Sequence, residues 1–433
     1  MEKRRLLLLR HPGLLLLVWT ISLGTMHAHS GETNMNTSTT APLASWEDFV
    51  DDLRPLQEKM LSRIPERLRD DPRIRQQAYR LMLMATARTA IDALVGDRRY
   101  PTFVPEINLA INLFQPNADT VYKSALIEPD GTYRVTGYRG SILFAKLGQL
   151  GPDMLRTGEP SGPLSYLDLD DLTLDDKGRF SVIVSSERPD GYTGDWWQMD
   201  PKAIKLMLRQ ISYDWPNEVD TSIAIDRLDV PAAKPRLSAQ QMSDNLAELP
   251  TMIANASMFF VAHVEKMRAD GYINKLKVYD LTQMSGLTGQ SYYEGAYDIG
   301  DDEALIVAVK VPEQVKYWSL ILTNDLYETT DWSNNHSSLN GSQARVDDDG
   351  YFRAVISAKD PGVPNWLDTA GFVSGAIQGR WLDASDTPIP DIRKVPFDKV
   401  REYLPANTPT VSAEQRDATI RARRAAQQVR KLW

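Results

Sequence analysis

The sequence predicts an α+β protein with two jelly-roll-like β-sandwich domains, helical insertions and a C-terminal helix. The first observation is a pattern that occurs twice, from Gly178 to Trp197 and from Gly350 to Trp366. In both copies a glycine and a phenylalanine open an apolar strand, and a serine and a proline follow at the same spacing. The second observation is a series of short alternating strands bounded by glycine turns, with helical patterns inserted between them.

The N-terminal elements are predicted to be helical. Ser45 followed by Asp48 is typical of a helix N-terminus. A longer helix is expected after the cap Asp71, with Pro72 in its first turn and Gly96 as its stop signal.

The chain then changes to strands. Asp130-Gly131 predicts a hairpin between the apolar segments 121–127 and 133–136. Asp200-Pro201 predicts the start of a helix that carries residues 204 to 211. Ser238 with Gln241, and later Ser412 with Gln415, match the pattern of a capping box and predict two further helices.

These signals divide the chain into seven segments. They are residues 1–29, a signal peptide; 30–44, a flexible leader; 45–105, an N-terminal helical segment; 106–200, the first β domain; 201–270, a helical insertion; 271–405, the C-terminal β domain; and 406–433, a C-terminal helix.

The N-terminus predicts export. Three basic residues, Lys3 to Arg5, precede an apolar stretch from Gly13 to Met26, and small residues follow at Ala28 and Ser30. The stretch is short for a membrane span, so a cleaved signal peptide is favoured over an uncleaved anchor. We therefore expect a periplasmic or secreted protein without a stable membrane span after signal removal.

Composition excludes several functions. A net charge of −9 argues against a nucleic-acid partner, because phosphate binding requires a basic surface. The absence of cysteine rules out thiol catalysis and disulfides. Phosphate-binding glycine motifs are missing, and no cofactor or metal is predicted from residue spacing, although oxygen ligands from separate loops leave no such signature. A homo-oligomer is left open.

Histidine is scarce, and two histidines are candidates for acid–base chemistry. His263 lies at helical spacing with apolar residues, which is typical of a core histidine or of one at the floor of a pocket. His336 lies in a polar loop with Asp331, where either a binding role or an exposed turn is expected. Asp331 and Asp368 are the candidates for a catalytic carboxylate.

Two polar and aromatic blocks supply candidate ligand-binding residues. Flat apolar rings beside amides and charged groups are suited to a sugar or an amphipathic ligand, but the same residues also pin loops to sheets. The candidates are Asn117, Asp119, Tyr122, Tyr317, Trp318, Asn324, Asn365, Trp366, Arg380 and Trp381.

The same blocks resemble a known family. Tyr317-Trp-Ser-Leu, Ser338-Leu-Asn340, Asp349-Gly350, the segment from Asp360 to Asp368 and Gly379-Arg380-Trp381 are similar to the C-terminal domain of the bacterial unknown-function family numbered 1214. The segment from Asn117 to Tyr122 is similar to the N-terminal part that accompanies this domain. The resemblance implies two jelly-roll-like β domains with helical additions and no established reaction.

Three functions are consistent with these observations. The first is an exported protein that binds a small amphipathic or carbohydrate-like molecule in a β-sandwich pocket lined by Trp318, Trp366 and Trp381. The second is a cofactor-independent hydrolase, lyase or isomerase that uses His336 or His263 with a carboxylate. The third is a structural module, which predicts a large exposed apolar face and no deep pocket.

Overall fold

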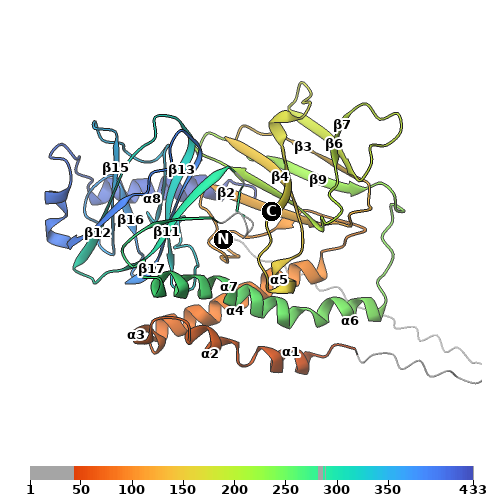
Figure 1. The fold of residues 1–433 in the computed structure, drawn as a ribbon, viewed down its shortest axis with the longest axis horizontal. Coiled ribbons are helices and arrows are strands. Elements are labelled where there is room, and N and C mark those ends of the chain that lie inside the picture. The colour runs from red at the N-terminus through yellow and green to blue at the C-terminus, as the bar shows by residue number, and fades with distance from the viewer. Residues whose placement is uncertain (1–42, 281–285, 288, 433) are drawn as a thin grey trace, which may run out of the picture. The chain divides into compact units, whose positions relative to one another are not determined.

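The computed structural model describes residues 43–280, 286–287 and 289–432. The predicted signal peptide, and the leader up to residue 42, lie outside the described residues. Residues from Leu43 onward form one compact unit. Its strands make four sheets in two sandwich-like pairs, and its helices include a C-terminal one, so the predicted fold class is confirmed (Figure 1).

The first sandwich contains strands from the N-terminal half of the unit. One of its sheets has the order β1-β2-β8-β4-β5 and the other the order β7-β6-β3-β9. The bounds are β1 (Val104–Pro105), β2 (Thr120–Leu126), β3 (Tyr133–Tyr138), β4 (Phe144–Leu150), β5 (Pro163–Asp168), β6 (Arg179–Ser185), β7 (Asp195–Gln198), β8 (Lys205–Ile211) and β9 (Ser222–Arg227).

The second sandwich repeats this topology. Its sheets have the orders β10-β11-β17-β13-β14 and β16-β15-β12-β18, so that adding nine to each strand number of the first sandwich gives the second. The bounds are β10 (Lys277–Tyr279), β11 (Gln290–Asp298), β12 (Glu303–Lys310), β13 (Val315–Asn324), β14 (Ser338–Asn340), β15 (Tyr351–Ser357), β16 (Trp366–Asp368), β17 (Ser374–Ala384) and β18 (Asp391–Pro396).

The repeated sequence pattern forms the same local structure in both sandwiches. β6 pairs with β7, and β15 with β16, in parallel, whereas the other strand pairs are antiparallel. The indole nitrogen of Trp196 donates to Ser185 Oγ at 3.0 Å, and that of Trp366 donates to Ser357 Oγ at 3.1 Å. Each serine hydroxyl in turn donates to the carbonyl two residues further on, at 2.6 and 2.7 Å. The pattern is thus a clip that fastens a parallel strand.

Three of the helices begin at caps that the sequence predicts. Asp71 accepts from the amide of Arg73 at the start of α4, and Ser238 and Ser412 form capping boxes at the starts of α6 and α8. The bounds are α1 (Trp46–Leu53), α2 (Leu56–Leu61), α3 (Glu66–Arg69), α4 (Pro72–Leu94), α5 (Met154–Thr157), α6 (Ala239–Ala247), α7 (Leu249–Ala269), α8 (Ala413–Gln428) and the 3-10 helices η1 (Leu169–Asp171) and η3 (Phe397–Tyr403).

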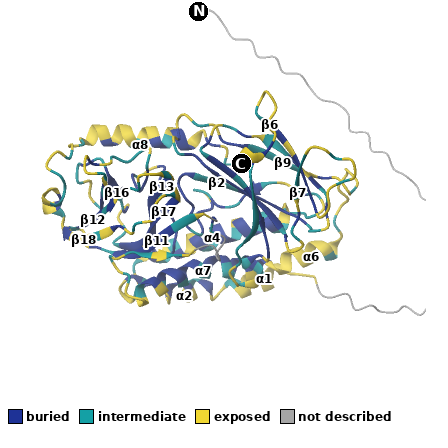
Figure 2. Ribbon diagram, turned by 45° about the horizontal axis from the view of Figure 1, so that its top comes forward, coloured by how far each residue is buried: buried dark blue, intermediate teal, exposed yellow. Residues whose placement is uncertain are grey.

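Helices α4 and α7 run side by side along the two sandwiches (Figure 1). Their contact is made by apolar residues at helical spacing, including Ala78, Leu81 and Ala85 of α4 and Ile253 and Ala256 of α7. The inner faces of these helices are buried, and their outer faces are exposed (Figure 2). The helices therefore form a layer that also covers one side of the space between the sandwiches.

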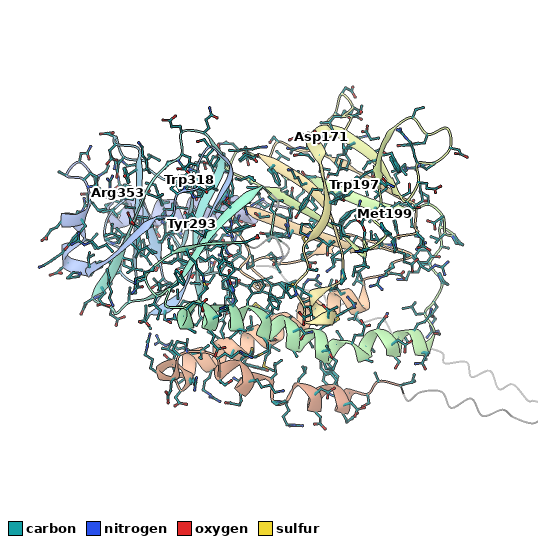
Figure 3. The ribbon with its side chains drawn as sticks, in the orientation of Figure 1. Asp171, Trp197, Met199, Tyr293, Trp318 and Arg353 are labelled. Carbon is teal, nitrogen blue, oxygen red and sulfur yellow. The ribbon has the colours of Figure 1, made fainter. Side chains whose placement is uncertain are left out.

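Each sandwich has its own apolar core. Tyr293 and Trp318 lie in the core of the second sandwich, whereas Met199, with the partly buried Trp197 against it, lies in the core of the first (Figure 3). Helix α8 and the residues just after it connect the two sandwiches. Arg423 donates to Ser338 of the second sandwich, and Arg430 pairs with Asp220 of the first at 2.8 Å.

The helix predicted after Asp200-Pro201 is wrong, because residues 205–211 form strand β8. Asp200 accepts from the amide of Lys202 and thus caps a turn, which looks like a helix start in sequence. Both faces of β8 are covered, so all its residues are buried and its apolar pattern does not alternate.

The hairpin predicted at Asp130-Gly131 is also wrong. β2 pairs with β1 and β8, whereas β3 pairs with β6 and β9. The turn therefore carries the chain from one sheet of the sandwich to the other.

A bilayer span requires a helix of sufficient length and hydropathy. None of the described helices meets both requirements.

The serine–tryptophan clips can be tested by mutation. Ser185→Ala and Ser357→Ala should each lower the free energy of unfolding by about 1 kcal/mol, because each removes a buried hydroxyl that both donates and accepts. Ser181 is exposed on the same strand as Ser185, so Ser181→Ala is the matched control and should change stability little. Chemical denaturation measures all three, and equal stabilities for Ser185→Ala and Ser181→Ala would contradict the role of the clip.

Candidate functional site

A cavity of about 170 Å³ lies between the two sandwiches. The sheet containing β2 and β8 supplies one wall, and the sheet containing β11 and β17 supplies the other. Short helix α5, Phe260 of α7 and several turn residues also line the cavity. A single water needs roughly 10–15 Å³ of such space, so the cavity has room for a small organic molecule. The apolar part of the wall comprises Ile107, Phe114, Leu150, Met154, Leu155, Met207, Ile211, Phe260 and Leu287.

Strand alternation decides which predicted residues reach this cavity. Successive side chains of a strand point to opposite faces of its sheet. On β17, Gln378 and Arg380 line the cavity, whereas Trp381 lies in the core of the second sandwich. On β13, Tyr317 packs in a cluster shared by the two sandwiches, whereas Trp318 lies in the same core as Trp381.

Arg380 is a buried cation in the cavity wall. Only 4% of the residue is exposed, and its guanidinium contacts Ser319, Gln115 and Gln378, all of them neutral. Among the described residues it has no carboxylate partner within ion-pair distance. Burial alone would lower the pKa of Arg380, but the surrounding tyrosine hydroxyls raise it above its usual value. The side chain therefore stays charged.

Two strained turns lie beside Arg380. The backbone φ angles of Phe114, Gln115 and Tyr327 are 59°, 53° and 61°. Residues other than glycine seldom adopt this left-handed region. The Gln115 amide donates to the Tyr327 carbonyl at 3.1 Å, so the turns support each other. All three residues line the cavity, and the side-chain nitrogen of Gln115 is buried with no hydrogen-bond partner in the described part of the chain. Strain of this kind is concentrated at ligand and active sites.

Another part of the cavity wall carries a balanced group of charges. Lys205 lies 3.3 Å from Glu106 and 3.6 Å from Asp153, and Glu106 also pairs with Arg88 of α4. Burial alone would lower the pKa of Lys205, but the two carboxylates raise it. Burial alone would raise the pKa values of both carboxylates, but neighbouring cations lower them. These groups neutralise one another and hold the wall together.

A hydrogen-bonded path leads from the cavity into the core. Tyr327 and Gln378 line the cavity, and both donate to Glu294, the tyrosine at 2.8 Å. The other oxygen of Glu294 lies 2.7 Å from His263 Nε2. Burial alone would raise the pKa of Glu294, but the hydrogen bond from His263 and its neighbours lower it. His263 is thus oriented by a carboxylate, and Tyr327 and Gln378 separate it from the cavity.

A second polar network joins the sandwiches next to the cavity. Asn117 lines the cavity and donates to the Tyr317 hydroxyl at 2.8 Å. That hydroxyl donates to Asp119 at 2.7 Å, and Asp119 also accepts from Trp215 and Asn340, each at 2.8 Å. Burial raises the pKa of Asp119 above its usual value, although these hydrogen bonds oppose the shift. Asp119 therefore connects the two sandwiches and lies behind the cavity wall.

Of the predicted ligand-binding residues, Asn117, Tyr122 and Arg380 line the cavity. Two others hold loops in place. Trp366 forms the second serine clip, and Asn365 donates to the carbonyls of Arg345 and Arg353. Asn324 accepts from two backbone amides of its own turn and donates to Glu328. The three tryptophans expected to line a pocket, Trp318, Trp366 and Trp381, do not line this one.

His336 and its neighbouring carboxylates also lie away from the cavity. His336 Nδ1 is 2.5 Å from the Trp366 carbonyl, and burial, reinforced by two arginines of α8, lowers the pKa of His336 to about 3. Asp331 caps its own turn. Asp368 accepts from the Ala370 amide, and burial raises the pKa of Asp368 to about 6. This group stabilises a loop. Among the described residues no cluster of three or more His, Asp or Glu is arranged to hold a metal.

Sequence reasoning did not select Gln115, Arg209, Tyr292, Glu294 or Gln378. A signal for some of them is present in the duplication. Strand registers place Tyr122 opposite Arg209 in the first sandwich and Tyr292 opposite Arg380 in the second. Aligning the two repeats would therefore have extended the prediction from Tyr122 and Arg380 to Arg209 and Tyr292.

Comparisons with known proteins agree with the fold. The model of a family described as "Protein of unknown function (DUF1214)" matches residues 297–374. The match includes strands β12 to β16, so the resemblance seen in the sequence is confirmed there.

Two solved structures are similar to the chain to different degrees. An uncharacterised protein from Burkholderia cenocepacia is similar with 25% identity and a TM-score of 0.76, over 82% of this chain and 97% of that one. A protein from Vibrio parahaemolyticus is 12% identical with a TM-score of 0.42, over 73% of this chain and 98% of that one, which is too distant to support an argument. No curated protein matches the sequence.

Glu328, next to Tyr327, makes the stability of this region depend on pH. Burial raises the pKa of Glu328 to about 7, and one of its oxygens has no partner in the part of the chain that the structure describes. The pKa of Glu328 is higher in the folded protein than in the unfolded chain. The stability that protonated Glu328 contributes to the folded state is therefore fully present below about pH 4.5 and is lost as pH rises to 7 and above. Glu328→Gln should therefore raise the free energy of unfolding by roughly 2–3 kcal/mol at pH 8 and change it little at pH 4.

Denaturation at both pH values measures this effect, with the exposed Glu66→Gln as control. A gain for Glu328→Gln that is equal at pH 4 and pH 8 would show that Glu328 is not the titrating group.

Proposed function

We propose that this chain is an exported protein that binds a small amphipathic molecule with an anionic group in the cavity between its sandwiches. The observation that carries the proposal is Arg380, a buried cation that faces a cavity and has only neutral partners among the described residues. Burying a charge without a counter-ion is costly, and an anionic ligand would remove that cost by completing the pair.

The surroundings of Arg380 support this choice of ligand. Planar guanidinium groups bind carboxylate and phosphate oxygens with paired hydrogen bonds. Tyr122, Tyr292 and Gln378 stand beside Arg380 and offer further polar contacts, and the remaining wall is largely apolar. Export is supported by the basic start and apolar stretch of the N-terminus.

Substitution of Arg380 tests the proposal. Isothermal titration calorimetry with benzoate and hexanoate should detect binding to the wild type, whereas the neutral benzamide and hexanamide should bind much more weakly. Arg380→Gln should weaken carboxylate binding by at least about tenfold, because charge-assisted hydrogen bonds are lost. Arg380→Lys should retain part of the affinity.

Arg423 supplies the matched control. It is also buried, and its hydrogen bonds go to neutral groups, but it does not line the cavity. Arg423→Gln should leave carboxylate affinity unchanged. Equal losses in Arg380→Gln and Arg423→Gln, or equal binding of acids and amides, would reject the proposal.

A second candidate function is acid–base catalysis on the bound molecule. It is favoured by the path from His263 through Glu294 to Tyr327, which ends at the cavity wall. The Tyr327 hydroxyl donates to Glu294, so it would accept a proton from the bound molecule as its own proton passes to Glu294 and on to His263, a relay of the kind that general acid–base catalysis uses. His336, the other histidine considered, has no such connection to the cavity.

Hydrogen exchange distinguishes this candidate from binding alone. Phenylpyruvate is an enolisable carboxylate, and catalysis predicts that the wild type accelerates exchange of its methylene protons in D₂O, as followed by NMR. Tyr327→Phe should abolish the acceleration while phenylpyruvate still binds, and Arg423→Gln should retain it. Exchange at the buffer rate with bound wild-type protein would leave binding as the function.

A further inference from the structure

The cavity contains a second arginine at the position that corresponds to Arg380. Arg380 lies opposite Tyr292 in the β11–β17 register, and Arg209 lies opposite Tyr122 in the β2–β8 register. β2 and β8 are the counterparts of β11 and β17 in the duplicated topology. All four residues line the same cavity, so each sandwich contributes one tyrosine–arginine pair to it.

The two arginines approach the cavity from opposite walls. Two residues after each arginine on the same strand face come Ile211 and Leu382, and these pack in one apolar cluster together with Tyr317. Strands advance by about 3.3 Å per residue, so each arginine lies ~7 Å along its strand from that contact. Both arginines are over nine-tenths buried, with 8% of Arg209 and 4% of Arg380 exposed.

Among the described residues, the other charged side chains that line the cavity are already paired. Lys205, Glu106 and Asp153, which also line the cavity, are paired with one another. Arg209 donates to the Tyr166 hydroxyl at 2.8 Å, and this contact fixes the direction of its side chain. The cavity thus presents two oriented guanidinium groups from equivalent positions of the repeats.

We infer that the ligand carries two negative charges, one bound by Arg380 and the other by Arg209. This inference rests on the proposed function and narrows its ligand class from anions to dianions. A molecule with two acidic groups satisfies both pairs of the duplicated site, and a phosphate monoester offers the same charge in compact form. A monoanion can pair with only one of the two guanidinium groups at a time.

Matched ligands and variants test the inference. The probes are isophthalate and phenyl phosphate as dianions, and benzoate as the monoanion with the same ring, at a pH where the phosphate is doubly ionised. By calorimetry the wild type should bind at least one dianion about tenfold or more tightly than benzoate. Arg209→Gln should reduce this dianion-to-monoanion ratio towards one, and Arg209→Lys should restore part of it.

Arg423→Gln is the control and should keep the wild-type ratio. Thermal unfolding confirms that each variant is folded before its ratio is used. A wild-type ratio near one, or a ratio unchanged in Arg209→Gln, would overturn the dianion inference while benzoate binding through Arg380 still stands. Failure of the wild type to bind any of the three acids would overturn both proposals.

Discussion

The structure depends on one buried carboxylate, that of Asp119, at the junction of the two sandwiches. It accepts hydrogen bonds from Trp215 of the first sandwich and from Tyr317 and Asn340 of the second. Its backbone carbonyl accepts from Arg430, just beyond α8. Buried polar networks are stable only when their members are satisfied, so these contacts specify how the two halves meet.

The cavity follows from that junction. Its walls belong to different sandwiches, and Asn117 connects the cavity wall to Tyr317 of the network. Because the walls are fixed before any ligand enters, Arg380 and Arg209 are held in place by the fold. Preorganised charges of this kind reduce the cost of ordering side chains on binding. The turns at Gln115 and Tyr327 have strained backbone conformations, so the fold tolerates a cost in conformational free energy beside the cavity.

Much of the fold could be predicted because its signals are local. Caps at Asp71, Ser238 and Ser412 depend on neighbouring residues, and the duplicated motif has a fixed spacing in the chain. The wrong predictions concern segments whose structure is determined by contacts with distant parts of the chain. Residues 205–211 became a strand because sheets cover both of its faces, and the turn at Asp130-Gly131 joins two sheets because each flanking strand finds other partners.

The site was harder to predict because alternation along a strand separates adjacent residues. Tyr317 and Trp318, and likewise Arg380 and Trp381, are neighbours in sequence but face the cavity side and the core, respectively. Residue type alone made both members of each pair candidates for ligand binding. Which member faces the cavity depends on the strand's phase relative to the opposite sandwich, and that information is not contained in the local sequence. The contact of His263 with Glu294 is likewise formed between a helix and a distant strand.

A crystal structure with a bromine-labelled aromatic carboxylate is the most direct test of the central claim, that the cavity between the sandwiches binds an anion through Arg380. Anomalous scattering locates the bromine independently of the fitted density. The account predicts a bromine signal between the two facing sheets, with the carboxylate paired to the Arg380 guanidinium. An empty cavity at saturating ligand, or a bound molecule whose carboxylate points away from Arg380, would contradict it.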